Sequence, residues 1–431
     1  MSLSRGNVAL LAAILAASAA WAGSRLVPAG EGYALTSVNT AVFRGSAVVS
    51  HGGMQYISYY AADSSVVVGR RPLGSSAWQF SVTPMKGNIA DAHNVISLGV
   101  DGDGYLHLSF DHHGHPLRYC RSVAPGSLDF GPLEPMTGTD EDDVTYPEFY
   151  SMPDGGLLFA YRSGASGNGN LVLKRYDTAS RSWSTVCSSL LDGEGLRNAY
   201  WQLFVDPAGT VHLSWVWRES WLVETNHDLC YARSTDGGRS WSRSDGSPYS
   251  LPITLENSEI AWSIPQNSEL INQTSMTADA AGHPYIATYW RSPGSSVPQY
   301  RLVWHDGTCW RMEQVGRRLT PFTLAGGGTK MIPIARPRIV SDGLSARYIF
   351  RDLERGGAVS IASTDSIGSG RWAVDDVTDF SVGAWEPNLD INLWNTDRRL
   401  HIYVQPVLQG DGERVAEADC ASSPVYILEY E

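Results

Sequence analysis

Cysteine is scarce in this sequence and is scattered along it. The 431 residues include five cysteines: Cys120, Cys187, Cys230, Cys309 and Cys420. Their wide spacing excludes a disulfide framework, and their odd number leaves at least one unpaired in a monomer, the state that we expect. Apolar residues, which make up 43% of the chain, must therefore provide the stability through a large core.

Basic residues are in the minority. Lysine and arginine together number 32, against 45 aspartates and glutamates, which gives a net charge of −13. Nucleic-acid-binding proteins carry a basic surface, so this balance argues against a nucleic-acid partner. It remains compatible with an anionic polysaccharide, provided that basic side chains gather locally in a cleft.

Long apolar runs are absent after the first residues. Residues 1–22, MSLSRGNVALLAAILAASAAWA, place Arg5 before an apolar stretch and end in Ala-Trp-Ala, the pattern of a cleaved signal peptide. The apolar stretch is too short to span a bilayer, and no later segment predicts a membrane span. We therefore expect an exported protein, periplasmic or extracellular, with one domain over residues 23–431.

Long helical periods are also missing, and short strands recur instead. A turn with glycine or aspartate, then an alternating aromatic-rich strand, appears seven times, for example in DGDGYLHLSF (101–110) and DPAGTVHLSWVW (206–217). STDGGRSW (234–241) fits the Asp-box pattern S-x-D-x-G-x-x-W, a turn between propeller strands. Short strands repeating every fifty to seventy residues or so predict an all-β fold, a single seven-bladed β-propeller. A β-sandwich or a solenoid is the alternative.

Three successive predicted blades share one layout. Strand ends and loops between blades converge on one face of a propeller, so residues distant in sequence meet there. DAHNV (91–95) and FDHHGHPL (110–117) flank one hairpin, and TYPEF (145–149) and AYRSG (160–164) flank the next. Each blade thus supplies one residue at its start and one at the end of its first hairpin. We expect three such pairs on one face: His93 with His113, Tyr146 with Arg162, and Tyr200 with Arg218.

This combination of side chains suits β-elimination from a uronic acid. Such a reaction must stabilise the C5 carboxylate as it becomes enolate-like, remove the C5 proton and protonate the leaving oxygen at C4. Arg162 suits the carboxylate, because a guanidinium can grip it with two hydrogen bonds. His93, His113 and Tyr146 suit proton transfer, with the pKa of the tyrosine lowered by nearby positive charge. The scheme requires no metal or organic cofactor.

The same segments, with SWVWRES (214–220), HDLCYARSTDGG (227–238) and NQTSM (272–276), resemble the seven-bladed propeller ulvan lyases of the bacterial-neuraminidase-repeat-like group. The resemblance covers most of the chain after residue 22. It implies a secreted polysaccharide lyase that acts on a uronate-containing, rhamnose-rich polysaccharide such as ulvan. It also implies catalytic or carboxylate-binding roles for His93 and His113, proton transfer by Tyr146, charge neutralisation by Arg162, and substrate contact by Tyr200. Asn94 and Arg218, in the same segments, are further candidate substrate contacts.

Several of these residues have simpler structural interpretations. His112 and His115 are expected to be solvated, so that His113 is the working residue of its turn. A metal site made from these three histidines lacks the C-x-x-C or H-E-x-x-H spacing of zinc sites. The structural alternatives are a turn cap for His93, an inter-blade salt bridge for Arg162, and core packing for Tyr146 and Tyr200.

Ligand chemistry suggests two places for a structural metal. His227 and Cys230, with His212 on a neighbouring strand, are candidate ligands of a structural zinc. The acidic run at residues 140–143 is a candidate for calcium, although such a run is also typical of a solvated loop.

Two other functions stay open. A glycoside hydrolase on the same propeller, rhamnosidase or sialidase-like, would need paired carboxylates. The candidate carboxylates are not obviously paired: Asp91, Asp111, Glu148 and Glu219. A sialidase would group three arginines around one carboxylate, for which four are available: Arg162, Arg218, Arg291 and Arg351. A non-catalytic glycan-binding propeller would use the fifteen tryptophans and twenty tyrosines to stack on sugars.

Overall fold

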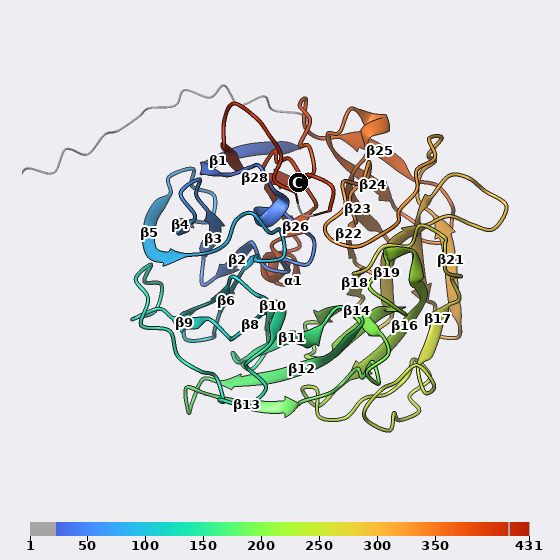
Figure 1. Cartoon of the computed structure of the whole chain (residues 1–431), viewed down its shortest axis with the longest axis horizontal. Coiled ribbons are helices and arrows are strands. Elements are labelled where there is room, and N and C mark those ends of the chain that lie inside the picture. Colours follow the sequence, from blue (N-terminus) through green and yellow to red (C-terminus); the bar gives the residue numbers. More distant parts are fainter. Residues whose placement is uncertain (1–22, 413, 431) are drawn as a thin grey trace, which may run out of the picture.

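Short antiparallel strands form a ring of seven blades around a central axis (Figure 1). The computed structural model describes residues 23–412 and 414–430, and the predicted signal peptide, residues 1–22, lies outside them. The blades follow one another around the ring in sequence order. The prediction of an all-β, seven-bladed propeller is confirmed.

The first three blades occupy residues 48–187. The first contains β2 (Val48–His51), β3 (Met54–Tyr60), β4 (Ser65–Pro72) and β5 (Gln79–Lys86). The second contains β6 (Ile96–Val100), β7 (Leu106–Phe110) and β9 (Tyr119–Arg121). The third contains β10 (Val144–Ser151), β11 (Leu157–Ala165), β12 (Asn168–Asp177) and β13 (Ser182–Cys187). A short strand from the second blade's loop, β8 (His113–His115), pairs with β10 and so ties the two blades together.

The next three blades repeat the four-stranded pattern. The fourth contains β14 (Asn198–Val205), β15 (Val211–Arg218), β16 (Asn226–Ser234) and β17 (Glu259–Trp262). A single parallel bridge between Gly169 and Asn198 joins it to the third. The fifth contains β18 (Ser275–Ala278), β19 (Pro284–Trp290), β20 (Gln299–His305) and β21 (Trp310–Gln314). The sixth contains β22 (Arg338–Ser341), β23 (Ala346–Arg351), β24 (Val359–Thr364) and β25 (Ala373–Asp376).

The seventh blade closes the ring with strands from both ends of the described chain. Its inner strands are β26 (Asn388–Leu389), β27 (Leu400–Val404) and β28 (Ser422–Tyr430). The outer strand is β1 (Ser24–Tyr33), which pairs with β28 from Ser24↔Tyr430 to Tyr33↔Ser422. Closure of this kind leaves no open gap in the ring, because the first strand fills the edge of the last sheet.

A repeated polar network fixes the turn between the first two strands of a blade. Asp101 accepts hydrogen bonds from the backbone N–H of Asp103 (3.0 Å) and Tyr105 (2.9 Å), and its other oxygen lies 3.2 Å from His107 Nε2. His107 Nδ1 is 2.8 Å from the hydroxyl of Tyr119. The fourth blade repeats the network with Asp206, His212 and Tyr231. The recurring turn-and-strand pattern of the sequence therefore reflects a structural unit.

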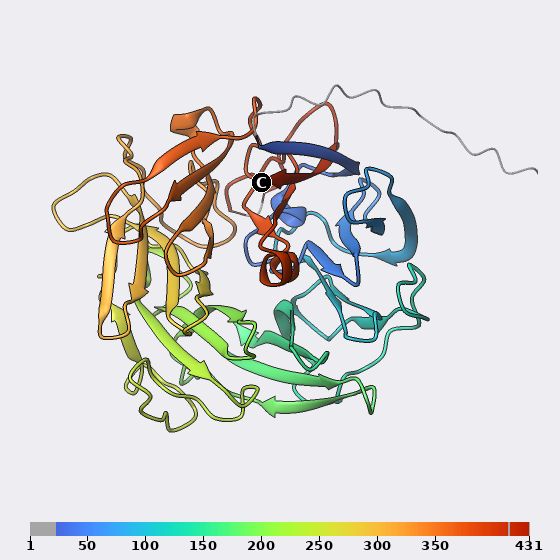
Figure 2. The ribbon, with the colours of Figure 1, turned by 180° about the vertical axis from the view of Figure 1, so that it is seen from behind.

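One short helix covers one end of the central channel. α1 (Ile391–Asp397) lies near the middle of the ring when it is seen from behind (Figure 2). Its Asn392 side chain donates to Ser50 O (3.3 Å) and Ser151 Oγ (2.9 Å), and that of Asn395 donates to Val205 O (3.2 Å). These partners lie at or next to the last residue of three inner strands. Within the described residues, no helix is long and apolar enough to cross a membrane.

Candidate active site

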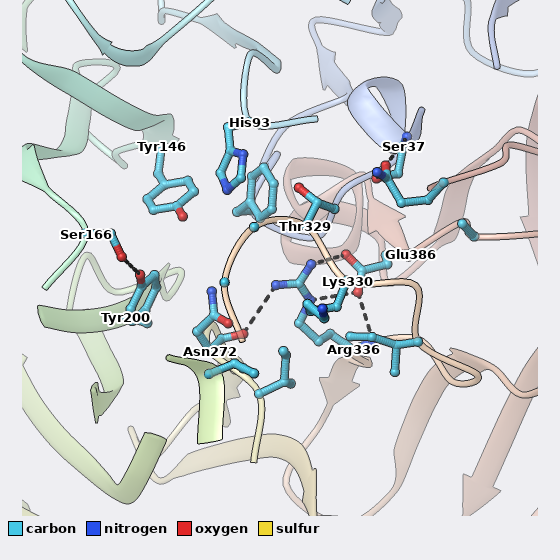
Figure 3. A pocket seen from close by; sticks show the side chains of 18 of the residues that line it. Ser37, His93, Tyr146, Ser166, Tyr200, Asn272, Thr329, Lys330, Arg336 and Glu386 are labelled. Atoms are coloured by element: carbon cyan, nitrogen blue, oxygen red, sulfur yellow. Dashed lines mark hydrogen bonds and ion pairs between the residues drawn. The ribbon is translucent and has the colours of Figure 1, made fainter. Parts of the chain in front are cut away.

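A cavity of about 160 Å³ lies at the starts of the inner strands, opposite the end that α1 covers. Figure 3 shows part of its lining. The cavity contains one residue from the start of every blade, in chain order Phe43, His93, Tyr146, Tyr200, Asn272, Arg336 and Glu386. Residues at or after the ends of first hairpins also line the wall, among them His113, Arg162, Arg218 and Arg351. The three predicted pairs of blade-start and hairpin-end residues thus line one cavity.

Two stacked imidazoles form one side of the cavity. The rings of His93 and His113 are nearly parallel, with centroids 4.0 Å apart and planes inclined by 17°. The Asp91 carboxylate bridges the Nδ1 atoms of both rings, with Oδ1 2.7 Å from His93 Nδ1 and Oδ2 2.6 Å from His113 Nδ1. Burial alone would raise the pKa of Asp91, but the hydrogen bonds from both imidazoles outweigh it and hold that pKa well below its usual range.

A column of planar groups supports these imidazoles. Phe43 stacks on His93, with ring centroids 5.4 Å apart, and the guanidinium of Arg336 lies 5.4 Å from the Phe43 ring centre. Glu386 accepts two hydrogen bonds from this guanidinium, at 2.7 Å from Nε and 2.6 Å from Nη2. Arg336 is therefore electrically compensated, and Glu386 is fixed in place.

Tyr146 enters the cavity from a distorted strand. Its φ of +57° is in the left-handed region, which a tyrosine rarely adopts, and the β10–β11 pairing shifts between Thr145 and Glu148. The guanidinium of Arg162 lies 5.0 Å from the Tyr146 ring centre and donates to Thr145 Oγ1 (3.2 Å). Backbone strain of this kind is typical of functional positions.

Tyr200 and Arg218 repeat this arrangement in the fourth blade. The Arg218 guanidinium lies 5.3 Å from the Tyr200 ring centre, and its Nη1 is 3.4 Å from the Tyr200 hydroxyl. Burial alone would raise the pKa of Tyr200, but Arg218 and Arg162 outweigh it and hold that pKa below its ordinary value. Burial raises the pKa of Tyr146 to about 12, and Tyr200 adds to this rise against opposition from Arg162. The prediction of a lowered pKa for Tyr146 is therefore wrong; the lowered pKa belongs to Tyr200.

The cavity carries an excess of positive charge. Arg162, Arg218 and Arg351 are each less than a tenth exposed, and none forms an ion pair with a carboxylate of the described residues. Their hydrogen bonds go mainly to backbone carbonyls, such as Gly164 O for Arg162 (3.1 Å) and Ile332 O for Arg351 (2.9 Å). Among the described residues that line the cavity, Glu386 is the only carboxylate. An anionic ligand would therefore be attracted to this site in spite of the negative net charge of the chain.

A glycine-rich segment, residues 324–331, covers part of the cavity, and we call it the strap. At one end Gly326 accepts from Val223 N (2.9 Å) and donates to the Glu224 carboxylate (2.9 Å). At the other end Lys330 Nζ is 2.8 Å from Asp411 Oδ2. The strap therefore joins loops of the fourth and seventh blades across the face that bears the site.

Two predictions about the histidine-rich segments need correction. Asn94 does not line the cavity: its side chain is fully buried and donates to Asn88 O (3.1 Å), so it holds the loop before β6. His112 is not solvated but fully buried, and its Nε2 accepts from Arg118 N (2.8 Å). Burial lowers the pKa of His112 to about 3, so this ring is neutral. His115 is exposed, as expected.

The predicted zinc ligands are not brought together. His212 belongs to the Asp206–Tyr231 turn network, and His227 binds Glu219 through Nε2 (2.9 Å) and Asp228 through Nδ1 (3.0 Å). Cys230 is buried opposite Trp215 in the β15–β16 ladder. Each predicted ligand thus has other partners along the ladder.

In the part of the chain that the structure describes, ligand atoms cluster closely enough for a metal only at Asp91, His93 and His113. The acidic run, residues 140–143, therefore does not bring three or more carboxylate side chains together as calcium ligands. Within this run, Glu141 forms an ion pair with Lys174, at 2.8 Å. At the Asp91 cluster, bond lengths of about 2.0–2.2 Å would keep neighbouring ligand atoms of a tetrahedral zinc roughly 3.3 Å apart. The observed 2.6 and 2.7 Å from oxygen to nitrogen are hydrogen-bond distances.

Four of the seven blade-start residues were missed by sequence reasoning: Phe43, Asn272, Arg336 and Glu386. A signal for two of them exists, because Tyr146-Pro147, Arg336-Pro337 and Glu386-Pro387 each place a proline directly after the cavity residue. Asp91 was considered only as a possible hydrolase carboxylate. Its contact with the second imidazole joins it to His113, 22 residues further along the chain. No local sequence pattern indicates such a contact.

Comparisons with known proteins agree with this fold. The model of the BNR repeat-containing family matches residues 54–318. A long-isoform ulvan lyase of Pseudoalteromonas sp. (strain PLSV) is 24% identical over 275 residues, 50% of this chain but 27% of the relative. An ulvan lyase of Alteromonas sp. (strain LOR) is 22% identical over 322 residues, 63% of this chain and 64% of the relative. The chain thus matches only about a quarter of the long isoforms.

Solved structures resemble the whole propeller at low identity. An ulvan lyase of polysaccharide lyase family PL25 superposes with a TM-score of 0.68 and 17% identity, covering 92% of this chain and 97% of that one. The polysaccharide lyase Uly1 superposes with a TM-score of 0.67 and 15% identity, covering 90% of each chain. The resemblance to ulvan lyases that the sequence motifs indicated is confirmed as a distant relationship. Since the family model matches more than half of its residues, the chain belongs to the BNR repeat-containing family.

Proposed function

We propose that this protein is a polysaccharide lyase that cleaves a uronate-containing, ulvan-like polysaccharide by β-elimination. The observation that carries the proposal is the cavity itself, where three buried guanidiniums that pair with no carboxylate of the described residues line the wall with two imidazoles and two tyrosines. The distant similarity to ulvan lyases supports it. One similar solved structure, with a TM-score of 0.67 and 16% identity, is bound to -[GlcA(1-4)Rha3S]-.

In the proposed reaction, Arg162 and Arg218 bind the C5 carboxylate and stabilise the charge that it gains as the C5–H bond breaks. The imidazole pair accepts the C5 proton. The electrons of the C5–H bond form the C4=C5 double bond, and the C4–O bond breaks. Tyr146, neutral because burial raises its pKa to about 12, donates a proton to the departing oxygen. The products are an unsaturated uronate end and a new hydroxyl, and the scheme uses no metal or organic cofactor.

Hydrolysis is less well supported by the carboxylates. A glycosidase of the usual kind needs two carboxyl groups on either side of the scissile bond. Glu386 is held by Arg336, and Asp91 is held by two imidazoles. Glu148 is buried beneath the cavity and does not line it, and Glu219 binds Arg197 and His227. Of the four arginines considered for a sialidase-like triad, Arg162, Arg218 and Arg351 line the cavity and Arg291 does not, so it is the carboxylates that disfavour hydrolysis.

We also propose that the protein acts as a monomer outside the cytoplasm. The signal-peptide pattern of residues 1–22 supports export, and a polymeric substrate would be met there.

The test is the ultraviolet absorbance of unsaturated uronate during incubation of the protein with ulvan. We expect this absorbance to grow with wild-type protein. Arg162→Lys keeps the positive charge but removes the planar guanidinium, which can bind a carboxylate with two hydrogen bonds. We therefore expect kcat/KM to fall about 10²- to 10³-fold, with a higher KM and a lower kcat. Arg291→Lys is the matched control, since Arg291 follows β19 in the fifth blade but binds Asn267 O and Glu269 outside the cavity. It should behave as wild type.

Two outcomes would contradict the proposal. New reducing ends without the absorbance would mean hydrolysis. Binding of ulvan without either product would mean a glycan-binding propeller.

A further inference from the structure

Asp91 holds both cavity imidazoles by the same ring atom. Its Oδ1 accepts from His93 N (2.9 Å) and lies 2.7 Å from His93 Nδ1, and its Oδ2 lies 2.6 Å from His113 Nδ1. The first two contacts span two residues, whereas the third joins the loop before β6 to β8 of the neighbouring sheet. One carboxylate therefore fixes the rotation of both rings and keeps them stacked at 4.0 Å.

This arrangement decides where the protons of the two rings are. An ionised carboxylate can only accept hydrogen bonds, so each Nδ1 that faces Asp91 must be the donor and carry a proton. A neutral imidazole has one N–H, and its other nitrogen is then the acceptor. Both rings are thereby held, when neutral, in the tautomer whose Nε2 can receive a proton. Both line the cavity.

We propose that Asp91 is a positioning residue that sets the tautomer of His93 and His113 together. This inference rests on the proposed lyase function for its kinetic consequences, but the tautomers themselves do not depend on it. Among the described residues, Asp91 is the carboxylate that both rings contact. The imidazole pair is then the base of the elimination, and the acid must be another group, in agreement with a neutral Tyr146.

Asp91→Asn tests the inference because an amide cannot accept from both rings. Its oxygen accepts from one Nδ1–H, whereas its NH₂ group requires the other Nδ1 to be an acceptor, which moves that ring's proton to Nε2. Asp142→Asn is the matched control. It removes the same charge from an exposed residue two positions before Val144, which pairs with His115 in the β8–β10 ladder.

The first readout is long-range ¹H–¹⁵N correlation of histidine-labelled full-length protein, with signals assigned by loss in His93→Gln and His113→Gln. At a pH high enough for both rings to be neutral, we expect both to have protonated Nδ1 and unprotonated Nε2 in the wild type and in Asp142→Asn. In Asp91→Asn one ring should change tautomer. Both wild-type rings with a proton on Nε2 and none on Nδ1, or unchanged tautomers in a folded Asp91→Asn variant, would overturn the inference. This readout is independent of whether the protein is a lyase.

The second readout is turnover of ulvan. By analogy with other aspartates that orient a catalytic histidine, Asp91→Asn should lower kcat about 10²- to 10⁴-fold with a small change in KM. Without the carboxylate, the acid limb of its residual pH–rate profile should move to lower pH. Among the described residues, the titratable or charged groups around the pair include Tyr146, His115, Asp143, Arg162 and Arg336, all unchanged in the variant.

A metal-binding role would give a different result. If a chelator abolished wild-type activity and Zn²⁺ or Mn²⁺ restored it, while Asp91→Asn no longer responded, Asp91 would be a ligand and the inference would be wrong. Wild-type kcat in Asp91→Asn would also overturn it. Absence of any turnover in the wild type, with the expected tautomers present, would contradict the proposed function alone.

Discussion

At the scale of single residues, neighbours rather than residue type decide the chemistry of this cavity. Tyr146 and Tyr200 occupy equivalent positions in adjacent blades, and each lies beside a guanidinium. Nevertheless the pKa of Tyr146 is raised to about 12, whereas that of Tyr200 is lowered. Arg218 donates a hydrogen bond to the Tyr200 hydroxyl, whereas Arg162 donates its hydrogen bonds to Thr145 Oγ1 and Gly164 O. Arg218 and Arg162, with hydrogen bonds from Ser166 and Asn198, outweigh burial and lower the pKa of Tyr200, whereas burial and Tyr200 raise that of Tyr146.

Beneath the cavity, Glu148 tests how burial of a carboxyl group changes its pKa and the stability of the fold. It is 1% exposed, and it accepts hydrogen bonds from the Tyr150 hydroxyl and from Gln202 Nε2 (3.1 Å). Burial raises its pKa from 4.5 to about 7, so the folded protein keeps its proton where the unfolded chain has lost it. Stability from this group is complete below pH 4.5 and is lost as the pH rises through 7, by about 3 kcal/mol in all.

Glu148→Gln should remove this part of the pH dependence. Urea unfolding at pH 5, 6, 7 and 8 should show the variant gaining stability relative to wild type as the pH rises. Glu141→Gln is the control, because hydrogen bonds from Lys174 and Thr137 outweigh burial and hold the pKa of Glu141 below its ordinary value. That variant should lose a constant amount over the same range. An unchanged pH slope in Glu148→Gln would contradict the prediction.

At the scale of elements, the site is built from loops that the blades hold in place. The strap, residues 324–331, lies against Trp221, an exposed aromatic residue that also lines the cavity. A Cβ at Gly327 would lie 2.6 Å from Trp221 Cε3, closer than atoms can approach. The contact therefore requires glycine, and it places the indole where a sugar ring could stack.

Gly327→Ala should displace Trp221 and weaken substrate binding. We expect KM for ulvan to rise about three- to tenfold with little change in kcat, since stacking is present in the ground state and in the transition state alike. Gly131→Ala is a suitable control, because its nearest neighbour would be 3.6 Å from the new Cβ and it is not part of the cavity wall. A fall in kcat alone would instead indicate that the strap acts on the chemical step.

At the scale of the whole molecule, the ring is held closed by pairing between β1 and β28. Val27 in β1 is 1% exposed and pairs with Ile427, so this outer strand is part of the core. By contrast, Val82 on β5, the outer strand of the first blade, is 68% exposed. The closing strand is therefore not equivalent to other outer strands.

Val27→Asp should lower the free energy of unfolding by about 3 kcal/mol or more, because it buries an unpaired charge at the ring closure. Val82→Asp makes the same exchange on an exposed outer strand and should change it by no more than about 0.5 kcal/mol. Denaturant unfolding of the two variants measures the difference. Equal losses would mean that β1 contributes no more than an ordinary outer strand.

Sequence patterns could predict the propeller and much of the site, because both repeat. Alternation of apolar residues marks each strand, and the turn residues mark each hairpin, so seven blades follow from local signals. His93, His113, Tyr146, Arg162, Tyr200 and Arg218 were found because three blades share one layout. Phe43, Asn272, Arg336 and Glu386 occupy the same place in the remaining blades, but their side chains differ too much in chemistry to suggest it.

What the sequence by itself determined is therefore the fold and the set of reactive side chains. The tertiary structure decided which of them meet and in which protonation state. Asn94 and His112, adjacent to working histidines, turn into the core, whereas Asp91 reaches His113 across the hairpin of the second blade. The physical reason is that strand formation follows a local alternation of side chains, while a pKa or a tautomer depends on charges and hydrogen bonds from segments that only the closed ring brings together.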